Sequence, residues 1–568
     1  MHHTTFCIGI FPRTRATQYT ENRLVSLAHQ LGIHSLTGCS IARLFFIQGE
    51  IDAHDLHPLV NDILVDPVTE IYQLSDPDQA LPAEASAHFI DISYLPGVTD
   101  TVAENLLHTA RQIGLRNITQ AATGWRYLLD DPLTENELQH LATKAFSNPT
   151  IQSYAIDHPI TPPFMTLRET PPEVEKIPIL DADSTALLDI SSKRRLSLDL
   201  AEMQAIQGYY QTQERNPTDV ELEMLAQTWS EHCVHKTFKA NISYTEITHE
   251  GESLQETIHG LLNTYIRGAT EQIHKDWIRS TFVDNAGIIA FDEKWDLAFK
   301  VETHNHPSAI EPFGGANTGL GGVIRDILGV SARPIASTDV LCFGYHTENL
   351  PAGTLHPRRI EDGVVHGIED YGNKMGIPTV NGAVLYHAGY TANPLVFCGS
   401  LGILPHGSHP TQPQSGDLII VIGGRTGRDG LRGATFSSME MNSDTGTIAG
   451  SAVQIGHPIN EKQVLEVILQ ARDEKLYNAI TDCGAGGLSS AVGEMSADLG
   501  ATVQLRDVPL KYAGLLPWEI WLSEAQERMV LAVPSENWSR LQEICELHDI
   551  EAVCIGTFEN SGHLKLYY

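Results

Sequence analysis

Ionisable side chains recur at every second position of one stretch of the chain, a spacing that could serve catalysis. The four residues alternate with apolar or neutral ones: Lys300, Glu302, His304 and His306. In a strand, this alternation places all four side chains on one face. Such a face is costly to bury unless it lines a polar site. The pattern therefore predicts a polar site on a strand that Pro307 ends, because proline has no backbone N–H to donate.

Glycines are concentrated directly after this stretch. Residues 314–322 read GGANTGLGG and lead into the helix-like apolar spacing of residues 323–328. Glycines ahead of a helix let backbone N–H groups approach an anion, and a helix N-terminus favours negative charge. With carboxylates nearby, this predicts a site for phosphate and magnesium. A tight turn is the alternative for the glycines, and half of a zinc site is the alternative for the two histidines.

The stretch also resembles a known signature. KVETHNHPSAIEPFGGANTGLGGVIRDI is similar to the motif of the phosphoribosylformylglycinamidine synthases, the ATP- and ammonia-using enzymes of purine biosynthesis. The resemblance extends from about residue 216 to the C-terminus. It implies ATP-dependent amidation of formylglycinamide ribonucleotide to formylglycinamidine ribonucleotide. It also implies an α+β chain that ends in two α/β domains similar to aminoimidazole ribonucleotide synthetase, at residues 216–405 and 406–568.

The resemblance assigns roles to residues of this motif. Lys300 would contact ATP, and Glu302 would bind a magnesium ion. Arg325 would hold the substrate, and Asp326 would bind a second magnesium ion. His304 would be the proton acceptor. Contacts to the ribonucleotide would come from four consecutive residues: Thr303, His304, Asn305 and His306. These roles fit the chemistry, since a guanidinium can fork onto a phosphate and carboxylates are hard oxygen ligands.

A second motif lies upstream. Thr218 and Glu221 form a capping box, which predicts a helix that starts there and leads toward SEHCVHK. This string resembles the family's SEHC motif. The resemblance makes His232 an active-site residue and His235 an ATP contact. We interpret Cys233 as a packed thiol rather than a nucleophile, because its neighbours offer no certain means of lowering its pKa.

Further motifs follow in the family's order. Gln454 in SAVQIGHP matches a substrate-contacting glutamine, and Asp482 in TDCGAGGLSS matches a ligand of the second magnesium ion. SEAQERM matches a substrate-contacting triplet, made here of Glu524, Ala525 and Gln526. The family often has serine in the middle of this triplet, so a contact from Ala525 would have to use its backbone. We interpret GGRTGRDG, residues 423–430, as a structural turn in preference to a phosphate contact.

The N-terminal third is an internal repeat. Residues 5–74 and 87–156 align without a gap at an offset of 82 (87 minus 5). Each copy is predicted to form strand, helix, strands, helix and strand, with a glycine closing the first helix. The copies resemble the small accessory subunit of the synthases, which implies ferredoxin-like units with a docking role. We therefore predict a duplicated domain at 1–156 and a proline-rich, partly helical linker at 157–215.

Composition limits the cellular setting. At 568 residues the chain requires several domains, and its 42% hydrophobic and 19% charged residues are typical of a globular protein. A formal charge of −34 argues against nucleic-acid or membrane partners. Eight cysteines without a CxxC pair indicate reduced thiols. Without a signal peptide or a membrane-span pattern, we expect a cytoplasmic protein.

The family normally has a second pair of catalytic domains, and the sequence repeats neither ETHNHP nor SEHC. It also lacks a glutaminase elbow. We therefore expect ammonia from a glutaminase subunit, and the second half from a separate polypeptide or from a homodimer. A truncated sequence would look the same. The alternatives to an active synthase are a non-catalytic scaffold half and another ATP-using enzyme of the same fold.

Overall fold

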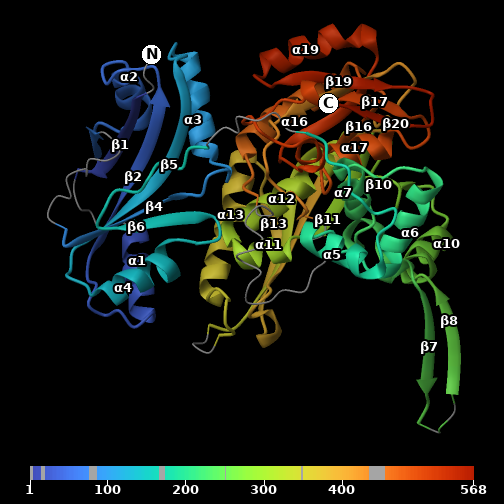
Figure 1. Ribbon diagram of the computed structural model, residues 1–568, viewed down its shortest axis with the longest axis horizontal. Coiled ribbons are helices and arrows are strands. Elements are labelled where there is room, and N and C mark those ends of the chain that lie inside the picture. Colours follow the sequence, from blue (N-terminus) through green and yellow to red (C-terminus); the bar gives the residue numbers. More distant parts are fainter. Residues whose placement is uncertain are drawn as a thin grey trace. The chain divides into compact units, whose positions relative to one another are not determined.

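The computed structural model describes residues 4–13, 19–75, 86–165, 173–249, 251, 253–346, 350–433, 436 and 454–568 (Figure 1). The chain divides into two compact units, Met1–Thr166 and Leu167–Tyr568. The domain boundaries expected at residues 156, 215 and 405 stay predictions. In the described part of the chain, no helix is long and apolar enough to cross a membrane.

The first unit contains the repeat. Its elements are β1 (Thr4–Pro12), α1 (Tyr19–Gln30), β2 (Cys39–Gly49), α2 (His57–Leu59), the π-helical turn η1 (Val60–Leu64), β3 (Glu70–Ser75), β4 (His88–Tyr94), α3 (Thr101–Gln112), β5 (Ile118–Leu129), α4 (Glu135–His140), the π-helical turn η2 (Leu141–Phe146) and β6 (Gln152–Ile156). Helices α1 and α3 begin 82 residues apart (101 minus 19). The strands form one sheet of order β3-β1-β2-β5-β4-β6, so the two copies join through the antiparallel pair β2–β5.

The structure does not confirm the ferredoxin-like description of each copy. A ferredoxin-like unit has the order βαββαβ, with four strands. In the described residues each copy has three, because one continuous strand takes the place of the two predicted between the helices. These strands are β2, with 11 residues, and β5, with 12.

A buried ion pair links two neighbouring strands of this unit. Asp91 of β4 and Arg126 of β5 are register partners, and both side chains are almost completely buried. Arg126 Nε lies 2.6 Å from one carboxylate oxygen of Asp91, and Nη2 lies 2.8 Å from the other. The guanidinium also lies over the ring of Phe89. This two-pronged geometry satisfies the carboxylate in an otherwise apolar setting.

Replacing Asp91 with alanine is expected to lower the free energy of unfolding by about 3–5 kcal/mol, because it leaves the Arg126 charge buried without its partner. Urea unfolding followed by circular dichroism measures this. The control is Arg43→Ala, which breaks a half-exposed pair with Glu70 and should cost about 1 kcal/mol or less. Equal effects of the two substitutions would contradict the prediction.

The second unit begins with short helices and a hairpin. They are α5 (Ser184–Arg194), α6 (Leu200–Thr212), α7 (Asp219–Thr228), α8 (Glu231–Val234), α9 (Lys236–Lys239), β7 (Asn241–Ile247), β8 (Ser253–His259), the π-helical turn η3 (Leu262–Arg267) and α10 (Gly268–Ile273). The predicted capping box is confirmed: Thr218 caps α7, with reciprocal hydrogen bonds to Glu221. The hairpin β7–β8 forms its own two-stranded sheet and extends away from the rest of this unit (Figure 1).

Two larger α/β layers follow. The first has sheet order β13-β12-β14-β11-β10-β9. Its elements are β9 (Ile278–Ser280), β10 (Gly287–Ala290), β11 (Trp295–Thr303), α11 (Asn305–Ile310), α12 (Pro312–Gly329), β12 (Arg333–Phe343), α13 (Pro357–Met375), β13 (Thr379–Tyr386), the 3-10 turn η4 (Ala388–Tyr390) and β14 (Leu395–Pro405). Helix α12 packs on β14 and β11 and so covers one face of this sheet.

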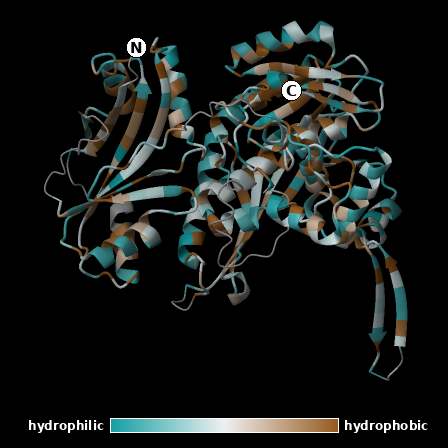
Figure 2. Cartoon of the chain, in the orientation of Figure 1, coloured by the Kyte–Doolittle hydropathy of each residue, from teal (hydrophilic) through white to brown (hydrophobic). Residues whose placement is uncertain are grey.

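The second layer has sheet order β16-β18-β15-β19-β17-β20. Its elements are β15 (Leu418–Gly423), α16 (Pro458–Asp473), β16 (Ala479–Asp482), α17 (Leu488–Met495), β17 (Ala501–Gln504), the 3-10 turn η5 (Leu505–Asp507), α18 (Pro517–Leu522), β18 (Arg528–Val533), the 3-10 turn η6 (Ser535–Asn537), α19 (Trp538–Leu547), β19 (Ala552–Phe558) and β20 (Leu564–Tyr567). All six residues of β18 are buried. Figure 2 shows hydrophobic residues along the strands beneath the more hydrophilic helix α19.

One hydrophobic core joins the two layers. It contains Leu320 of α12, Tyr371 of α13, Val464 of α16 and Leu541 of α19. The helices of the two layers therefore pack against each other between the two sheets, which fixes the first layer against the second. Residues far apart in the sequence meet along this helix interface, among them Arg325 of α12 and Glu461 of α16.

Candidate active site

Strand β11 presents Lys300 and Glu302 on the face that α12 covers, as the alternation predicts. The strand ends at Thr303, however, so His304 and His306 do not lie on it. The prediction that Pro307 ends the strand is wrong, because Pro307 lies in the first turn of α11. A proline fits there, since N–H groups of a helix's first turn have no partner within the helix.

The glycine run 314–322 is helical. It lies inside α12, so both predictions, a phosphate-binding loop and a tight turn, are wrong. The glycines allow close packing instead. A Cβ on Gly315 would lie 2.4 Å from the backbone nitrogen of Ser308, and one on Gly319 would lie 2.8 Å from Cβ of His304. Tertiary contact thus outweighs the low helix propensity of glycine, and it brings α12 against the histidine segment.

Replacing Gly315 with alanine is expected to lower the free energy of unfolding by about 1–3 kcal/mol, because the new methyl group would overlap the backbone of α11. Alanine at Gly322 is the control within the same helix. Its Cβ would meet only Nη2 of Arg325, at 3.9 Å, so helix propensity should stabilise that variant by up to about 1 kcal/mol. Denaturant titration distinguishes the two, and a stabilising Gly315→Ala would refute the packing argument.

His304 is held in one orientation by the backbone. Its Nδ1 lies 2.5 Å from the carbonyl oxygen of Gly315. A carbonyl only accepts, so Nδ1 carries the hydrogen and Nε2 is left with its lone pair in the neutral ring. Burial lowers the pKa of His304, which favours this neutral form. The ring can therefore accept a proton at Nε2.

Acidic groups gather around Lys300. Its Nζ lies 3.2 Å from Oδ2 of Asp326 on α12 and 3.4 Å from Oε2 of Glu302. Burial lowers the pKa of Lys300, but the carboxylates of Asp326 and Glu302 outweigh it and raise the pKa. Burial and the neighbouring Asp482 raise the pKa of Asp326. Asp482, at the end of β16, accepts a 2.8 Å hydrogen bond from Asn285. The structure thus brings the three predicted metal ligands to one region from separate elements.

The donor set suits a magnesium ion that also binds a ligand. Within the described residues, the only cluster of three ligand atoms closer than 4.8 Å is the exposed trio Asp52, His54 and Asp55 of the first unit. Glu302, Asp326 and Asp482 therefore do not form a closed all-protein cage. Magnesium is commonly held by one or two carboxylates and completed by water and substrate phosphates. Burial raises the pKa of Asp326 and the charge of Asp482 raises it further, so a bound cation would stabilise the ionised carboxylate.

The SEHC segment supplies a second histidine. His232 lies on α8, and burial lowers its pKa, while the charge of Glu302 opposes the shift. His235 follows α8 in a left-handed conformation with an exposed side chain. Cys233 is exposed, so its interpretation as a packed thiol is wrong. Desolvation by surrounding atoms nevertheless raises the pKa of Cys233, which argues against a nucleophilic thiolate.

Gln454 and the predicted triplet that begins at Glu524 lie together in the buried interior. Gln454 Nε2 donates to Glu524, and its Oε1 has no partner among the described residues. Burial raises the pKa of Glu524 to about 7. Ala525 is fully buried at a φ of 38°; its N–H donates to Asp429 O, and its carbonyl accepts from Arg528. Its backbone is therefore committed within the protein, which does not support the backbone contact predicted for it.

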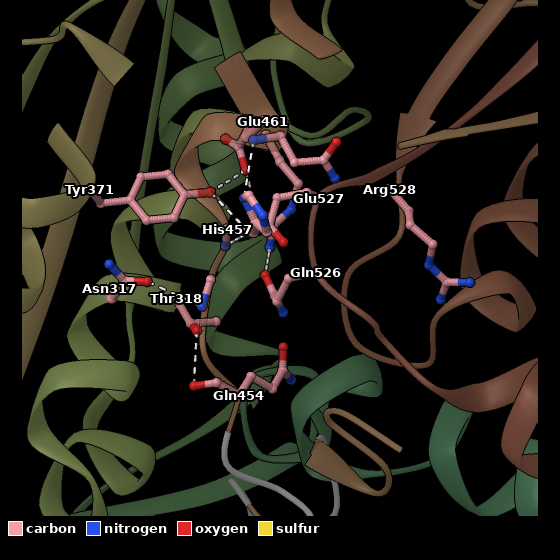
Figure 3. A network of polar contacts seen from close by, with 12 residues as sticks. Asn317, Thr318, Tyr371, Gln454, His457, Glu461, Gln526, Glu527 and Arg528 are labelled. Atoms are coloured by element: carbon pink, nitrogen blue, oxygen red, sulfur yellow. Dashed lines mark hydrogen bonds and ion pairs between the residues drawn. The ribbon is translucent and has the colours of Figure 1, made fainter. Parts of the chain in front are cut away.

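Arg325 is buried and largely satisfied by protein partners. Its Nη1 lies 3.0 Å from Glu461 of α16, and its Nη2 donates to Gln526. Its Nε has no partner among the described residues. Three residues that complete this network were missed by sequence analysis: Tyr371, Glu461 and Glu527 (Figure 3). The only sequence signal was the position of Glu527 directly after the predicted triplet.

The loop GGRTGRDG makes contacts within the protein, as a structural turn would. Arg425 pairs with Glu551, and Arg428 pairs with Glu519. Gly430 has a positive φ of 67°, and a Cβ there would lie 2.1 Å from Nε2 of Gln454. The absence of a side chain at Gly430 therefore leaves space for the side chain of Gln454.

Comparisons with known proteins agree with this architecture. Residues 283–404 and 414–568 match the families described as AIR synthase related protein, N-terminal domain and C-terminal domain, and residues 187–236 match the formylglycinamide ribonucleotide amidotransferase linker domain. The chain is 37% identical over 396 residues to phosphoribosylformylglycinamidine synthase subunit PurL of Thermoplasma acidophilum, covering 69% of this chain and 49% of that one. The corresponding subunit of Picrophilus torridus is 38% identical over 385 residues, covering 67% and 48%.

A solved structure, Thermotoga maritima PurL complexed with FGAR, is 34% identical with a TM-score of 0.50, and the match covers 62% of this chain and 52% of that one. The two α/β layers and their shared helix interface define an AIR synthase related protein. Within that class, the chain belongs to the phosphoribosylformylglycinamidine synthase family. It spans about half the length of these relatives.

Proposed function

We propose that this chain catalyses the ATP-dependent amidation of formylglycinamide ribonucleotide with ammonia. The observation that carries the proposal is the arrangement around β11. Lys300 and three acidic residues gather there, and Nε2 of the neighbouring His304 has no hydrogen-bond partner among the described residues. This combination provides charge stabilisation for a triphosphate and a base for the incoming nitrogen. A scaffold half would have no need for three carboxylates gathered around one lysine.

In the proposed reaction, the amide oxygen of the ribonucleotide attacks the γ-phosphorus of ATP, and ADP leaves. Ammonia then adds to the activated carbon, and the carbon–oxygen bond breaks to release phosphate. The new nitrogen loses a proton, which His304 accepts at Nε2. Lys300 offsets charge on the transferred group. His232 is the second candidate for proton transfer, because it lies close enough to Glu302 for that charge to affect its pKa.

Magnesium fits this site. Glu302 would hold one ion, and Asp326 and Asp482 would hold the second, while His235 would contact ATP. When bound, the ions would neutralise the charge of the triphosphate. Exposed Thr303 and half-buried Asn305 and His306 continue the proposed substrate surface. Asn305 also stabilises the fold, since its Oδ1 accepts a 2.8 Å hydrogen bond from the backbone N–H of Val396.

Phosphate release by the full chain tests the proposal, with ATP, magnesium, ammonium chloride and formylglycinamide ribonucleotide present. We expect release that requires the ribonucleotide and ammonium together, and we expect mass spectrometry to detect the amidine. ATP hydrolysis that ignores the ribonucleotide, both alone and with a second synthase half added, would contradict the proposal and favour a scaffold.

Among the described residues of the second unit, no helix covers one face of the first layer's sheet. In β11 the uncovered side chains include Phe299, which is 46% exposed, and Val301, which is 37% exposed. Leu385, at the β13 edge of the same sheet, is 56% exposed. Contiguous apolar surface of this kind usually marks an interface. We propose that this face packs against the corresponding sheet of another synthase half, which a second copy of the chain can supply.

Phe299→Glu is expected to prevent this association, because it would bury an unpaired carboxylate in an apolar interface. Light scattering after size exclusion measures the mass of the full chain at several concentrations. The unsubstituted chain should self-associate in the absence of another half, and the variant should stay monomeric. Val365→Glu, on the exposed side of α13, is the control and should leave association unchanged. Association that survives Phe299→Glu would place the interface elsewhere.

The remaining parts of the proposal concern partners. A glutaminase subunit would supply ammonia. The duplicated N-terminal domain would serve docking in the manner of the small accessory subunit, and the linker would connect it to the catalytic layers. We place the protein in the cytoplasm, where reduced thiols are the rule.

A further inference from the structure

The guanidinium of Arg325 is fixed by residues of helix α16 and of the segment just before β18. Glu461 of α16 and Gln526, beside β18, take Nη1 and Nη2 respectively. Glu527 lies 3.8 Å from Nη1. All of these side chains are buried. Nε is buried without a partner among the described residues, and Nη1 and Nη2 each carry a second N–H beyond these hydrogen bonds.

Tyr371 ties the two carboxylates together. Its hydroxyl lies 2.5 Å from Oε2 of Glu461 and 3.0 Å from Oε1 of Glu527. Figure 3 shows the hydroxyl directed toward both of these side chains. Two glycines make room for its ring. A Cβ on Gly321 would lie 2.6 Å from the ring, and one on Gly456 would lie 2.7 Å from it. The ring therefore has a close-fitting site between α12 and the segment before α16.

The hydrogen count supports a continuous chain of hydrogen bonds. The phenol has one hydrogen, so it cannot donate to both carboxylates. Burial raises the pKa of Glu461 to about 8, against the opposing charge of Arg325, and this direction favours a proton on Glu461. It can then donate to Tyr371, which donates to Glu527. Glu527 also accepts a 2.8 Å hydrogen bond from the backbone N–H of His457. With a proton on Glu461, these hydrogen bonds hold Glu461 and Glu527 in place without two negative charges beside each other.

We propose that Tyr371 is a positioning residue for the ribonucleotide: through Glu461 and Glu527 it fixes the guanidinium of Arg325, the residue proposed to hold this substrate. This inference rests on the proposed function, since it takes the ribonucleotide as the ligand. It explains why a tyrosine hydroxyl is buried between two carboxylates where phenylalanine would fill the same space. It also implies that removing the Tyr371 hydroxyl weakens binding of the ribonucleotide but not of ATP, whose proposed contacts are Lys300 and His235.

The test uses Tyr371→Phe in the full chain, which keeps the ring and removes the hydroxyl. Isothermal titration measures the Kd of formylglycinamide ribonucleotide and, separately, of ATP with magnesium. We expect the first Kd to rise about tenfold, equivalent to ~1.4 kcal/mol, with the second unchanged within about twofold. Tyr477→Phe is the matched control. Tyr477 belongs to the same core, and its hydroxyl donates to Ser331 at 2.8 Å. That variant should lose stability but keep both affinities.

Several results would overturn the inference. An unchanged ribonucleotide Kd in Tyr371→Phe would do so, and so would equal losses for ATP and the ribonucleotide. A similar loss in Tyr477→Phe would reduce the effect to general destabilisation. If the unsubstituted chain binds ATP but not the ribonucleotide, the proposed function itself fails. That failure is distinguishable, because it appears in the unsubstituted protein and not only in the variant.

Discussion

Replacing His304 with glutamine is expected to lower turnover of formylglycinamide ribonucleotide by about 10²–10⁴-fold, the usual contribution of a positioned base. The hydrogen bond from Nδ1 to Gly315 leaves Nε2 as the acceptor, and glutamine has no comparable basic nitrogen. Phosphate release under saturating substrates measures the loss. The Kd of the ribonucleotide should change by less than about threefold, because the substitution removes a proton acceptor and retains a polar side chain.

His387→Gln is the matched control for this prediction. His387 is an exposed histidine of the same layer, and its side chain caps η4. Its replacement should leave turnover within about twofold. If His304→Gln keeps most of its activity while His232→Gln loses it, the proton acceptor is His232 and the assignment of His304 is wrong.

Replacing Lys300 with methionine is expected to raise the KM for ATP by about 30-fold, because it removes the cation that would face the triphosphate, and losing one charged partner of a binding site costs about 2 kcal/mol. The ammonium group lies within 3.4 Å of two carboxylates, those of Asp326 and Glu302. Methionine keeps the apolar stem and removes the charge. Those carboxylates would then repel the triphosphate, so ATP should be affected more than the ribonucleotide. Initial rates at varied ATP and fixed ribonucleotide measure the effect.

Lys294→Met is the control for charge alone. Lys294 lies just before β11, and its side chain is exposed. It should leave the KM for ATP within about twofold. A similar KM in Lys300→Met and the unsubstituted chain would remove Lys300 from the ATP site and leave it a purely structural partner of Asp326.

Local signals in the sequence predicted local structure well. The capping box at Thr218 marked the start of α7, because both of its hydrogen bonds join residues only three positions apart. The strand-forming alternation at Lys300 and Glu302 placed both on the face toward α12. The same alternation was extended too far, since His304 and His306 leave the strand for α11. The ends of strands and helices depend on the tertiary contacts of the backbone, and a pattern of side-chain types does not contain that information.

The glycine run shows where local sequence signals fail to predict the structure. Its composition predicts a loop, because glycine weakens an isolated helix. In the folded chain the run forms part of α12. Its glycines are required there because larger side chains would collide with Ser308, His304 and Tyr371. The benefit of close packing arises only when distant elements are already in place. No local propensity could reveal it.

By itself, the sequence determined the family, the tandem repeat and the residue types of the site, because motifs and repeats are properties of neighbouring positions. Only the tertiary structure decided how these residues work together. Arg325 and Glu461 are 136 positions apart, and Tyr371 and Glu527 are 156 apart, yet each pair is in contact. The tertiary structure also decided that Phe299 and Val301 stay exposed. The physical reason is the same in both cases: burial and partnership are set by the packing of helices and sheets from distant parts of the chain.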